Sequence, residues 1–282
     1  MKLVTWNTQW CCGLDGVVSP RRIVDGARAL GDFDVLCLQE IAQGYGAMPG
    51  APGDQPAELA ALLPGFRLFF GAAVDEFAAD GTRQRFGNLI ATRLPVLQLQ
   101  HHPLPWPADA GVPSMPRMCT VLTLLDPGLG ALRVMTTHLE YYAQSQREAQ
   151  IDAIRRLHAE AWALSGRARL PEETGGPFEV FPRPAEAILC GDMNFPAAAP
   201  ERARLLAPIS GGAPAFHDAW AVLHPGAPHA PTCGIHPVGF VDRPECFDYV
   251  FLTEGLAARL ATHGIDAATA ASDHQPVWVT LR

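Results

Sequence analysis

The sequence predicts an α+β fold whose sheets contain both parallel and antiparallel strands. Apolar runs of strand length recur along the 282 residues, and segments with helical periodicity lie between some of them. One pair of runs is joined directly by the turn signal Asp126-Pro127-Gly128, which predicts an antiparallel hairpin. The chain shows no break in composition and no repeat of about 20–50 residues, so residues 1–282 are expected to form one domain.

Eight strands and four helices are expected along the chain. The longest helix is indicated by apolar residues at helical spacing from Ile151 to Leu164. Proline and glycine, 26 of each, cluster between the elements, and the segment from Pro171 to Pro184 is expected to be a disordered insertion. In chain order the expected elements are strand 3–6, helix 20–30, strand 35–38, helix 56–63, strands 89–92, 119–124 and 132–137, helix 144–164, strand 188–190, helix 200–206, and strands 249–252 and 277–281.

Charge and hydropathy exclude several classes of protein. The formal net charge of −8 argues against a protein that coats nucleic acid, because such binding depends on lysine and arginine displacing counterions from phosphates. It does not exclude a local basic groove. No apolar run reaches the roughly 18 residues of a membrane span, and the first residues lack the pattern of a signal peptide. We therefore expect a soluble protein that is not secreted.

The seven cysteines are an odd number without a C-x-x-C pair, which favours a reducing cytoplasm over a disulfide-bonded fold. Cys37, Cys119 and Cys190 lie in apolar runs, where a reduced thiol packs as a small hydrophobe. The adjacent Cys11 and Cys12 leave a redox or metal-binding role open, but no second Cys/His pair lies nearby. A structural role is the expected one for both.

Polar and acidic residues stand at the downstream ends of several apolar runs, where the edge of a sheet delivers side chains into a shared crevice. Asn7, Glu40 and His138 each end such a run. Each taken alone is also compatible with a turn cap, a solvated strand end or a rim histidine. Asp192 and Asn194 form a more specific signal, because both follow one buried strand and a glycine.

A second acidic group lies near the C-terminus. Asp273 and His274 precede the last expected strand, and Asp248 opens the strand before it. A carboxylate beside a histidine can bind a cation while the imidazole donates to a phosphoryl oxygen, and a second carboxylate can orient that imidazole. These three residues are therefore expected to act as a unit.

The combined set of oxygen donors and two histidines suits Mg²⁺ or Mn²⁺ better than Zn²⁺, since no thiolate is positioned to join it. Phosphate esters are the substrates that such a set favours, because a divalent ion neutralises developing charge and a carboxylate can activate water. The sequence has no G-x-S-x-G elbow, Walker A lysine, G-x-G-x-x-G after a strand or H-E-x-x-H. Acyl-transfer, nucleotide-switch and zincin chemistry are thus unsupported.

As a set, these residues resemble the endonuclease/exonuclease/phosphatase superfamily, the DNase I-like metal hydrolases. The resemblance runs from Thr5 to Trp278 and rests on the ordered segments TWNTQW, LCLQE, FGNLIATRLP, TTHLE, CGDMNFP, CFDYVF and ASDHQPVW. It implies a four-layer α/β/β/α sandwich, in which two mixed β-sheets pack face to face and the active site lies at one end.

The resemblance also implies a role for each matching residue. Glu40 would be the direct metal ligand, Asn7 would help to fix the metal or phosphate, and Asp273 would lie at or near the metal. The remaining roles follow the same motifs: Asp192 and Asn194 would position and activate water, His274 would bind the scissile phosphate, Asp248 would orient His274, His138 would be a further phosphate contact, and Asn88 would lie at the rim.

The substrate stays open between nucleic acid and small or lipid phosphoesters, with a slight preference for a nuclease-like phosphodiesterase. The WN segment continues as TQWCCG, unlike WN-x-NG-x-R of abasic-site endonucleases, and RPECFDYVF lacks the W-C-D-R core of inositol polyphosphate 5-phosphatases. A catalytically silent module that binds a phosphorylated ligand is the competing class. No obligate protein partner is indicated. Residues that either face the site or are structural are Arg117, Arg147, Gln150, Trp106, Tyr141 and Tyr142.

Overall fold

The computed structural model of the chain describes residues 1–167, 183–237, 239 and 241–282. The strands are β1 (Lys2–Asn7), β2 (Val35–Gln43), β3 (Arg67–Phe77), β4 (Arg83–Thr92), β5 (Val96–Pro103), β6 (Met118–Asp126), β7 (Gly130–His138), β8 (Ala187–Asp192), β9 (Phe216–Asp218), β10 (Asp248–Thr253), β11 (Leu260–Ile265) and β12 (Val277–Leu281). The helices are α1 (Pro20–Ala29), α2 (Gln55–Leu62), α3 (Gln144–Ser165), α4 (Pro200–Leu206), α5 (Ala219–Leu223) and α6 (Glu254–Ala257), with 3₁₀ turns at Gln9–Cys11 and Ser210–Gly212.

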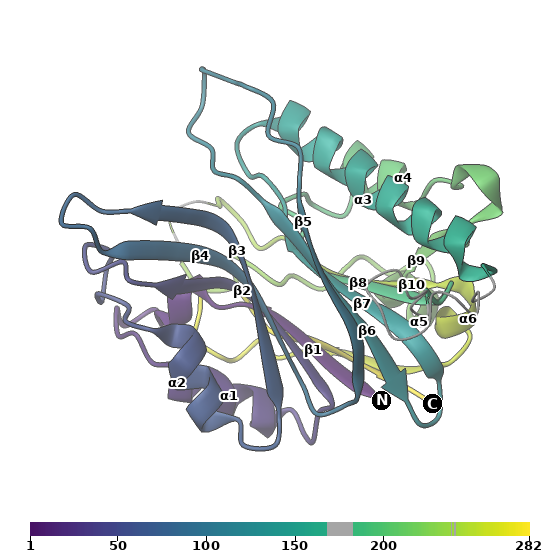
Figure 1. The fold of residues 1–282 in the computed structure, drawn as a ribbon, viewed down its shortest axis with the longest axis horizontal. Coiled ribbons are helices and arrows are strands. Elements are labelled where there is room, and N and C mark those ends of the chain that lie inside the picture. Colours follow the sequence, from purple (N-terminus) through teal and green to yellow (C-terminus); the bar gives the residue numbers. More distant parts are fainter. Residues whose placement is uncertain (168–182, 238, 240) are drawn as a thin grey trace, which may run out of the picture.

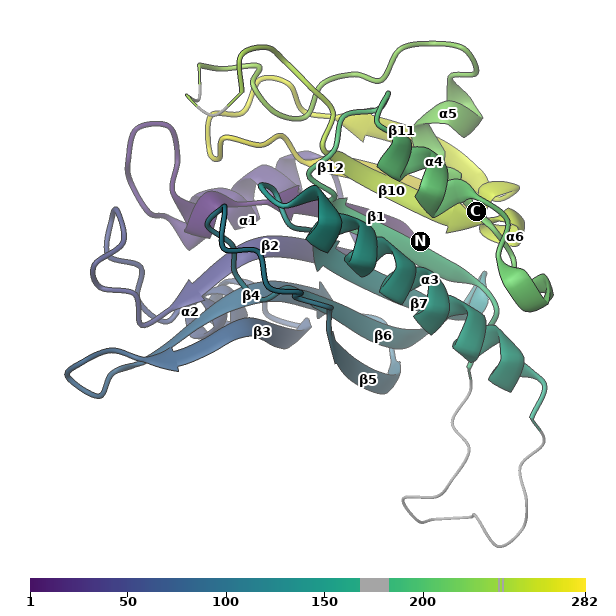
Figure 2. The ribbon, with the colours of Figure 1, turned by 90° about the horizontal axis from the view of Figure 1, so that it is seen from above.

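The strands form two six-stranded mixed sheets, with the orders β11-β12-β1-β2-β4-β3 and β5-β6-β7-β8-β10-β9. The sheets lie face to face, with α1 and α2 outside the first and α3 and α4 outside the second (Figure 1). This arrangement confirms the expected α+β sandwich of four layers. The two ends of the chain lie close together at one end of the sandwich (Figures 1 and 2).

The alternation of apolar side chains along the central strands accounts for the layers. In β1, Leu3 packs between the sheets whereas the next residue, Val4, packs against α1 and α2. In β8, Ile188 packs between the sheets and Leu189 packs toward α3 and α4. Successive strand residues point to opposite faces, so a run that is apolar throughout is buried on both sides.

The expected mixture of strand pairings is present. β6 and β7 form the antiparallel hairpin, with Asp126 opposite Gly130, whereas β1 pairs in parallel with β2 and β7 with β8. All four expected helices exist, with ends that differ by at most one residue from the expected ones.

Four strands were not predicted: β3, β5, β9 and β11. All four are edge strands of the two sheets. Their side chains are partly exposed and include polar residues, so the apolar run that marked the other strands is weak or missing. The segment from Pro171 to Pro184, expected to be a disordered insertion, lies mostly outside the described residues. In the described part of the chain, no helix is long and apolar enough to cross a membrane.

A buried histidine joins α3 to the second sheet. His158 Nδ1 accepts a hydrogen bond from Arg133 Nη2 at 2.6 Å, and its Nε2 donates to the carbonyl oxygen of Pro214 at 2.9 Å. Burial and the neighbouring Arg133 lower the pKa of His158 from 6.5 to about 4. The folded protein therefore holds this ring neutral.

We expect His158 to make the protein less stable as the pH falls. The unfolded chain binds this proton near pH 6.5, whereas the folded chain binds it near pH 4. The contribution of His158 to the free energy of unfolding is therefore fully present above pH 6.5 and is lost as the pH falls toward 4. Between about pH 6.5 and about pH 4.5 the loss amounts to roughly 2 kcal/mol. Urea titrations of wild type and His158→Gln over this range measure it. Equal pH slopes for the two proteins would contradict the assignment.

Candidate active site

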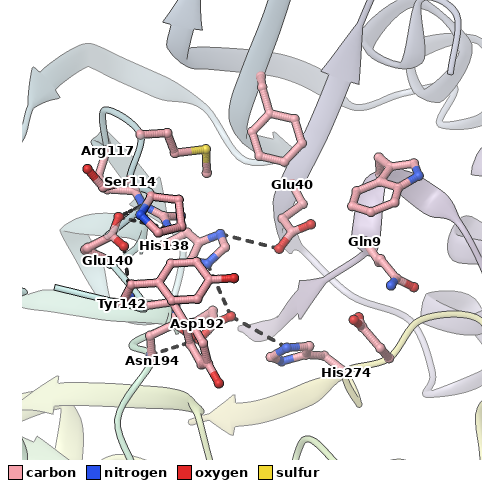
Figure 3. Close-up of a pocket in the computed structure, with 16 residues that line it drawn as sticks. Gln9, Glu40, Ser114, Arg117, His138, Glu140, Tyr142, Asp192, Asn194 and His274 are labelled. Atoms are coloured by element: carbon pink, nitrogen blue, oxygen red, sulfur yellow. Dashed lines mark hydrogen bonds and ion pairs between the residues drawn. The ribbon is translucent and has the colours of Figure 1, made fainter. Parts of the chain in front are cut away.

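The strand registers bring the predicted polar residues to one edge of the sandwich. His138, at the end of β7, stands opposite Asp192 at the end of β8, and Asp192 stands opposite Asp248 at the start of β10. In the first sheet, β1 ends at Asn7 beside β2, which carries Glu40. Figure 3 shows Glu40, His138, Asp192 and His274 converging on one space from these different elements.

Three unusual backbone conformations position this cluster. Glu40 has a φ of 60° and lies where the pairing of β2 with β4 shifts register, so the side chain turns out of the regular strand alternation. Asn194 has a φ of 52°. Gly191 has a φ of 130°, and a Cβ there would lie 2.0 Å from the carbonyl oxygen of Thr137, so only glycine allows β8 to approach β7 this closely. Strain of this kind is typical of functional sites.

The cluster lines a pocket of about 480 Å³. One side of the pocket is acidic and includes Glu40, Asp192 and Asp273. The pocket is also lined by apolar side chains, which come from the 3₁₀ turn after β1, from β4 and from the loops before β6 and α3. The acidic residues of the cluster thus share one cavity with apolar side chains.

Asp192 is held from two sides. Its Oδ1 accepts a hydrogen bond from the backbone nitrogen of Asn194 at 2.9 Å, and its Oδ2 accepts one from Asn7 Nδ2 at 2.8 Å. Asn194 is itself fixed, because its Nδ2 donates to the carbonyl oxygen of Leu139 at 2.7 Å. Burial raises the pKa of Asp192 to about 6. The carboxylate therefore has a fixed direction and a proton affinity above that of an ordinary aspartate.

Asp248 and His274 form a buried hydrogen-bonded pair. His274 Nδ1 lies 2.8 Å from Asp248 Oδ2, which also accepts a hydrogen bond from the hydroxyl of Thr232 at 2.7 Å. Nε2 of the same ring lies 3.7 Å from Asp192 Oδ2. Burial alone would lower the pKa of His274, but the carboxylates of Asp248 and Asp192 raise it well above its ordinary value. The ring is a cation whose Nε2 faces the pocket.

Glu40 and Asp273 supply further acidic groups. Burial and the charge of Asp273 raise the pKa of Glu40 to about 7, and burial also raises the pKa of Asp273. Asn7 Nδ2 donates to Glu40 Oε1 at 3.0 Å as well as to Asp192, while Asn7 Oδ1 accepts from the backbone nitrogen of Gln9. The carboxylates are therefore crowded and linked by one amide.

His138 lies between Glu40 and Asp192. Its Nδ1 is 3.8 Å from Glu40 Oε1, and its Nε2 is 3.5 Å from Asp192 Oδ2. Burial and the positive charges of Arg117 and His274 lower the pKa of His138 well below its ordinary value. The two histidines thus differ in charge, since His138 is neutral where His274 is cationic.

Arg117 and Glu140 complete the site. Both are buried, and Nε and Nη2 of Arg117 lie 3.3 Å from Glu140 Oε2. Nη1 of Arg117 is buried without a hydrogen-bond partner. Both residues line the pocket, opposite Glu40 and Gln9 in Figure 3. Glu140 was not predicted, although it stands two residues after His138 in TTHLE, and Arg117 was left undecided.

Several other candidates take structural positions. Arg147 donates to the carbonyl oxygens of Glu140 and Tyr141 and pairs with Glu201, and Gln150 Oε1 accepts from the backbone nitrogen of Glu140. Neither lines the pocket, so both support the loop that follows β7.

The undecided aromatic residues divide between the pocket and the surface. Trp106 is exposed and does not line the pocket, whereas Tyr141 and Tyr142 do line it. Asn88 is buried and donates to the carbonyl oxygen of Met118 at 2.8 Å, behind the site. The seven cysteines are all buried and unpaired, as expected of packed thiols, and burial raises the pKa of Cys11 to about 12.

Solved structures with the same architecture were found. A protein from Beutenbergia cavernae described as an endonuclease/exonuclease/phosphatase is 24% identical to this chain. The alignment covers 100% of this chain and 71% of that protein, with a TM-score of 0.71. A mannosyl-6-phosphatase from Bacteroides thetaiotaomicron is 15% identical, with 100% and 99% of the two chains covered and a TM-score of 0.65. A 3′ phosphatase from Neisseria bound to a product DNA hairpin is 18% identical, with 100% and 99% covered and a TM-score of 0.61.

These structural similarities show the fold. No curated protein sequence matches the chain. Residues 4–274 match the profile of the Endonuclease/Exonuclease/phosphatase family, which is nearly the whole length of the chain. The protein therefore belongs to the endonuclease/exonuclease/phosphatase family and is an enzyme that hydrolyses phosphate esters.

Proposed function

We propose that this enzyme is a divalent-metal-dependent phosphodiesterase in which Asp192 activates the attacking water. The observation that carries the proposal is the arrangement of Asp192, whose two oxygens are fixed by Asn7 and the backbone of Asn194 beside the cationic His274. In the reaction, water oxygen forms a bond to phosphorus, its proton passes to Asp192, and the bond from phosphorus to the leaving oxygen breaks. Residues 1–282 act as one catalytic domain, because both sheets contribute to the site.

Glu40 and Asp273 are proposed to hold Mg²⁺ or Mn²⁺. Their raised pKa values report negative groups crowded together in a buried place, which a divalent cation relieves. Asn7 uses its amide nitrogen on two carboxylates and its oxygen on Gln9, so it positions the donors beside the ion. When bound there, the ion supplies charge that stabilises the phosphoryl oxygens in the transition state.

Asp192, Asp248 and His274 also lie within 4.8 Å of one another and offer a second possible metal group. The hydrogen bond of 2.8 Å between His274 and Asp248 leaves no space for an ion between their facing atoms. A cationic imidazole does not coordinate a metal, because its nitrogen lone pair carries a proton. We therefore assign this group to proton and phosphate binding.

The remaining polar groups bind the phosphoryl oxygens. His274 presents a charged Nε2–H, oriented by Asp248, and neutral His138 offers one ring N–H. Arg117, whose buried Nη1 has no hydrogen-bond partner, adds positive charge at the lining of the pocket. Donors fixed before the reaction stabilise developing negative charge without reorganisation. The seven buried, unpaired cysteines support a reducing compartment such as the cytoplasm.

Hydrolysis of bis-p-nitrophenyl phosphate with Mn²⁺ or Mg²⁺ tests the proposal. We expect turnover that EDTA abolishes and that added metal restores. Metal-dependent binding of a phosphate ligand without turnover on any ester would support the ligand-binding module instead. Turnover that survives complete metal removal would overturn the assignment of Glu40 and Asp273 as metal donors.

Arg117→Lys is expected to lower kcat/KM about 10-fold while the protein stays folded. Lysine keeps a positive charge beside Glu140, whose isolation would be costly because it is buried, but it lacks the second donor of the guanidinium fork. Arg204→Lys, at an exposed ion pair with Asp152, is the matched control and should leave kcat/KM unchanged. Full activity of Arg117→Lys would show that the guanidinium fork is not needed to bind substrate.

A further inference from the structure

The apolar wall of the pocket belongs to no step of the proposed reaction. It consists of Trp10, Phe86, Pro113, Met115, Tyr141 and Tyr142, which share the cavity with the acidic cluster. Tyr142 is 59% exposed although it lines the pocket. Flat and apolar side chains that stay open to solvent beside a catalytic cluster are typical of a site for an apolar or planar group.

The loop between β5 and β6 forms one part of this wall and is fixed in place. Gln146 Nε2, from α3, donates to the carbonyl oxygen of Pro107 at 2.7 Å, and Gln150 Nε2 donates to that of Pro105 at 3.3 Å. Within the loop, Trp106 Nε1 donates to the hydroxyl of Ser114 at 2.8 Å. Pro113 and Met115 are therefore held toward the pocket by bonds to a rigid helix.

The segments that carry Trp10 and Tyr141 are fixed in the same way. Trp10 Nε1 donates to the carbonyl oxygen of Pro49 at 3.1 Å, and Gln55 Nε2 donates to the carbonyl oxygen of Trp10. Arg147 Nη1 donates to the carbonyl oxygen of Tyr141 at 2.9 Å. Because these segments are held by hydrogen bonds to other parts of the chain, the wall is preformed and little ordering has to accompany binding.

The charges of the pocket limit how much phosphate it accepts. Among its described lining residues, Arg117 is the single arginine or lysine, and it faces the four acids Glu40, Glu140, Asp192 and Asp273. Among the residues that the structure describes, seven further arginines form ion pairs with aspartate or glutamate: Arg22, Arg83, Arg93, Arg147, Arg202, Arg204 and Arg243. A nucleic-acid duplex needs a row of available cations for its successive phosphates, whereas these residues suit one phosphoryl group with its metal ion.

We infer that the substrate is a small phosphodiester that carries a planar or apolar group, which binds against Trp10, Met115 and Tyr142. Its single phosphoryl group would be held by Arg117, His274 and the metal ion proposed at Glu40 and Asp273. This inference rests on the proposed function and names the substrate class of the same site. It departs from the slight preference for a nuclease, because Arg117 is the single arginine or lysine among the described residues that line the cavity and four acids share that cavity.

The test compares two chromogenic diesters that share a leaving group. Phenyl p-nitrophenyl phosphate and methyl p-nitrophenyl phosphate both release p-nitrophenolate, so the difference in their kcat/KM values measures the second substituent. With Mn²⁺ we expect wild type to prefer the phenyl ester at least about 10-fold, as stacking on an aromatic side chain allows. Duplex and single-stranded DNA are assayed in parallel and should be cleaved less efficiently per phosphodiester.

Two pocket variants and a control locate the preference. Tyr142→Ala and Met115→Ala should each raise KM for the phenyl ester several-fold and leave the methyl ester within about 2-fold. Phe77→Ala is the control, because Phe77 is 70% exposed and does not line the pocket, and the substitution should change neither value.

The possible failures are distinguishable. Equal kcat/KM values for the two esters, or DNA as the best substrate, would overturn the inference and leave the hydrolase mechanism intact. An equal loss on both esters in Tyr142→Ala would also overturn it, because the ring would then support the site without contacting the substituent. No metal-dependent turnover on any ester would overturn the inference and the proposed function together.

Discussion

Asp192→Asn is expected to reduce kcat on bis-p-nitrophenyl phosphate by about 10³-fold or more while the protein remains folded. The amide cannot take the proton of the attacking water, and a well-placed general base contributes about 10²- to 10⁴-fold. The loss should appear in kcat and not in KM, because proton transfer occurs only in the transition state. Steady-state kinetics with saturating Mn²⁺ measure both constants.

The same substitution should have little effect on the stability of the protein. The Asp192 carboxylate is buried, and the negative charge of Asp248 adds to the cost of ionising it, so its pKa is raised in the folded protein. Asparagine has the same shape without that charge and keeps one oxygen for Asn7 or Asn194. We expect the free energy of unfolding to change by no more than about 1 kcal/mol.

A matched control shows whether a loss of activity depends on the position of Asp192 or follows from any replacement of aspartate by asparagine. Asp152→Asn changes a carboxylate that is about half exposed on α3 and pairs with Arg204. It should leave kcat unchanged. If Asp192→Asn retained activity within 10-fold of wild type, the water would have to be activated by another group, and Glu40 would be the next candidate because its pKa is about 7.

The central strands were predictable because burial on both faces demands apolar residues at every position. β8 and β10 are buried along their whole length, and their sequences read as uninterrupted runs. An edge strand does not have this requirement. β5 is only half-buried and carries glutamine and histidine, and three-residue β9 is too short to show a pattern, so pairing with a neighbour defines both and the local sequence does not.

The same reasoning explains which site residues were predicted. Asp192 and His274 lie next to buried strands, so the sequence shows which edge they share. Arg117 stands in a proline-rich loop, where an arginine ordinarily faces solvent, and its position depends on Glu140, 23 residues further along the chain. A contact of that kind forms only when β6 and β7 pair, and no local pattern records it.

His274→Gln is expected to lower kcat/KM by about 10²- to 10⁴-fold. Nε2 of the positively charged His274 lies 3.7 Å from Asp192 Oδ2, beside the proposed water-activating carboxylate, and glutamine offers only a neutral donor there. Asp248→Asn should cost less, because it leaves the ring in place and removes only the carboxylate that fixes Nδ1–H at 2.8 Å and favours the charged form.

A double-mutant cycle shows whether Asp248 acts through His274. If it does, the variant carrying both changes should be no slower than His274→Gln alone within about 3-fold, because the carboxylate has no imidazole left to orient. Asp248 also accepts a hydrogen bond from Thr232, so urea titrations of all four proteins measure the structural part of its role separately. Additive losses in kcat/KM would mean that Asp248 contributes independently of His274. The assignment of Asp192, Asp248 and His274 to proton and phosphate binding, in preference to a metal site, would then have to be revised.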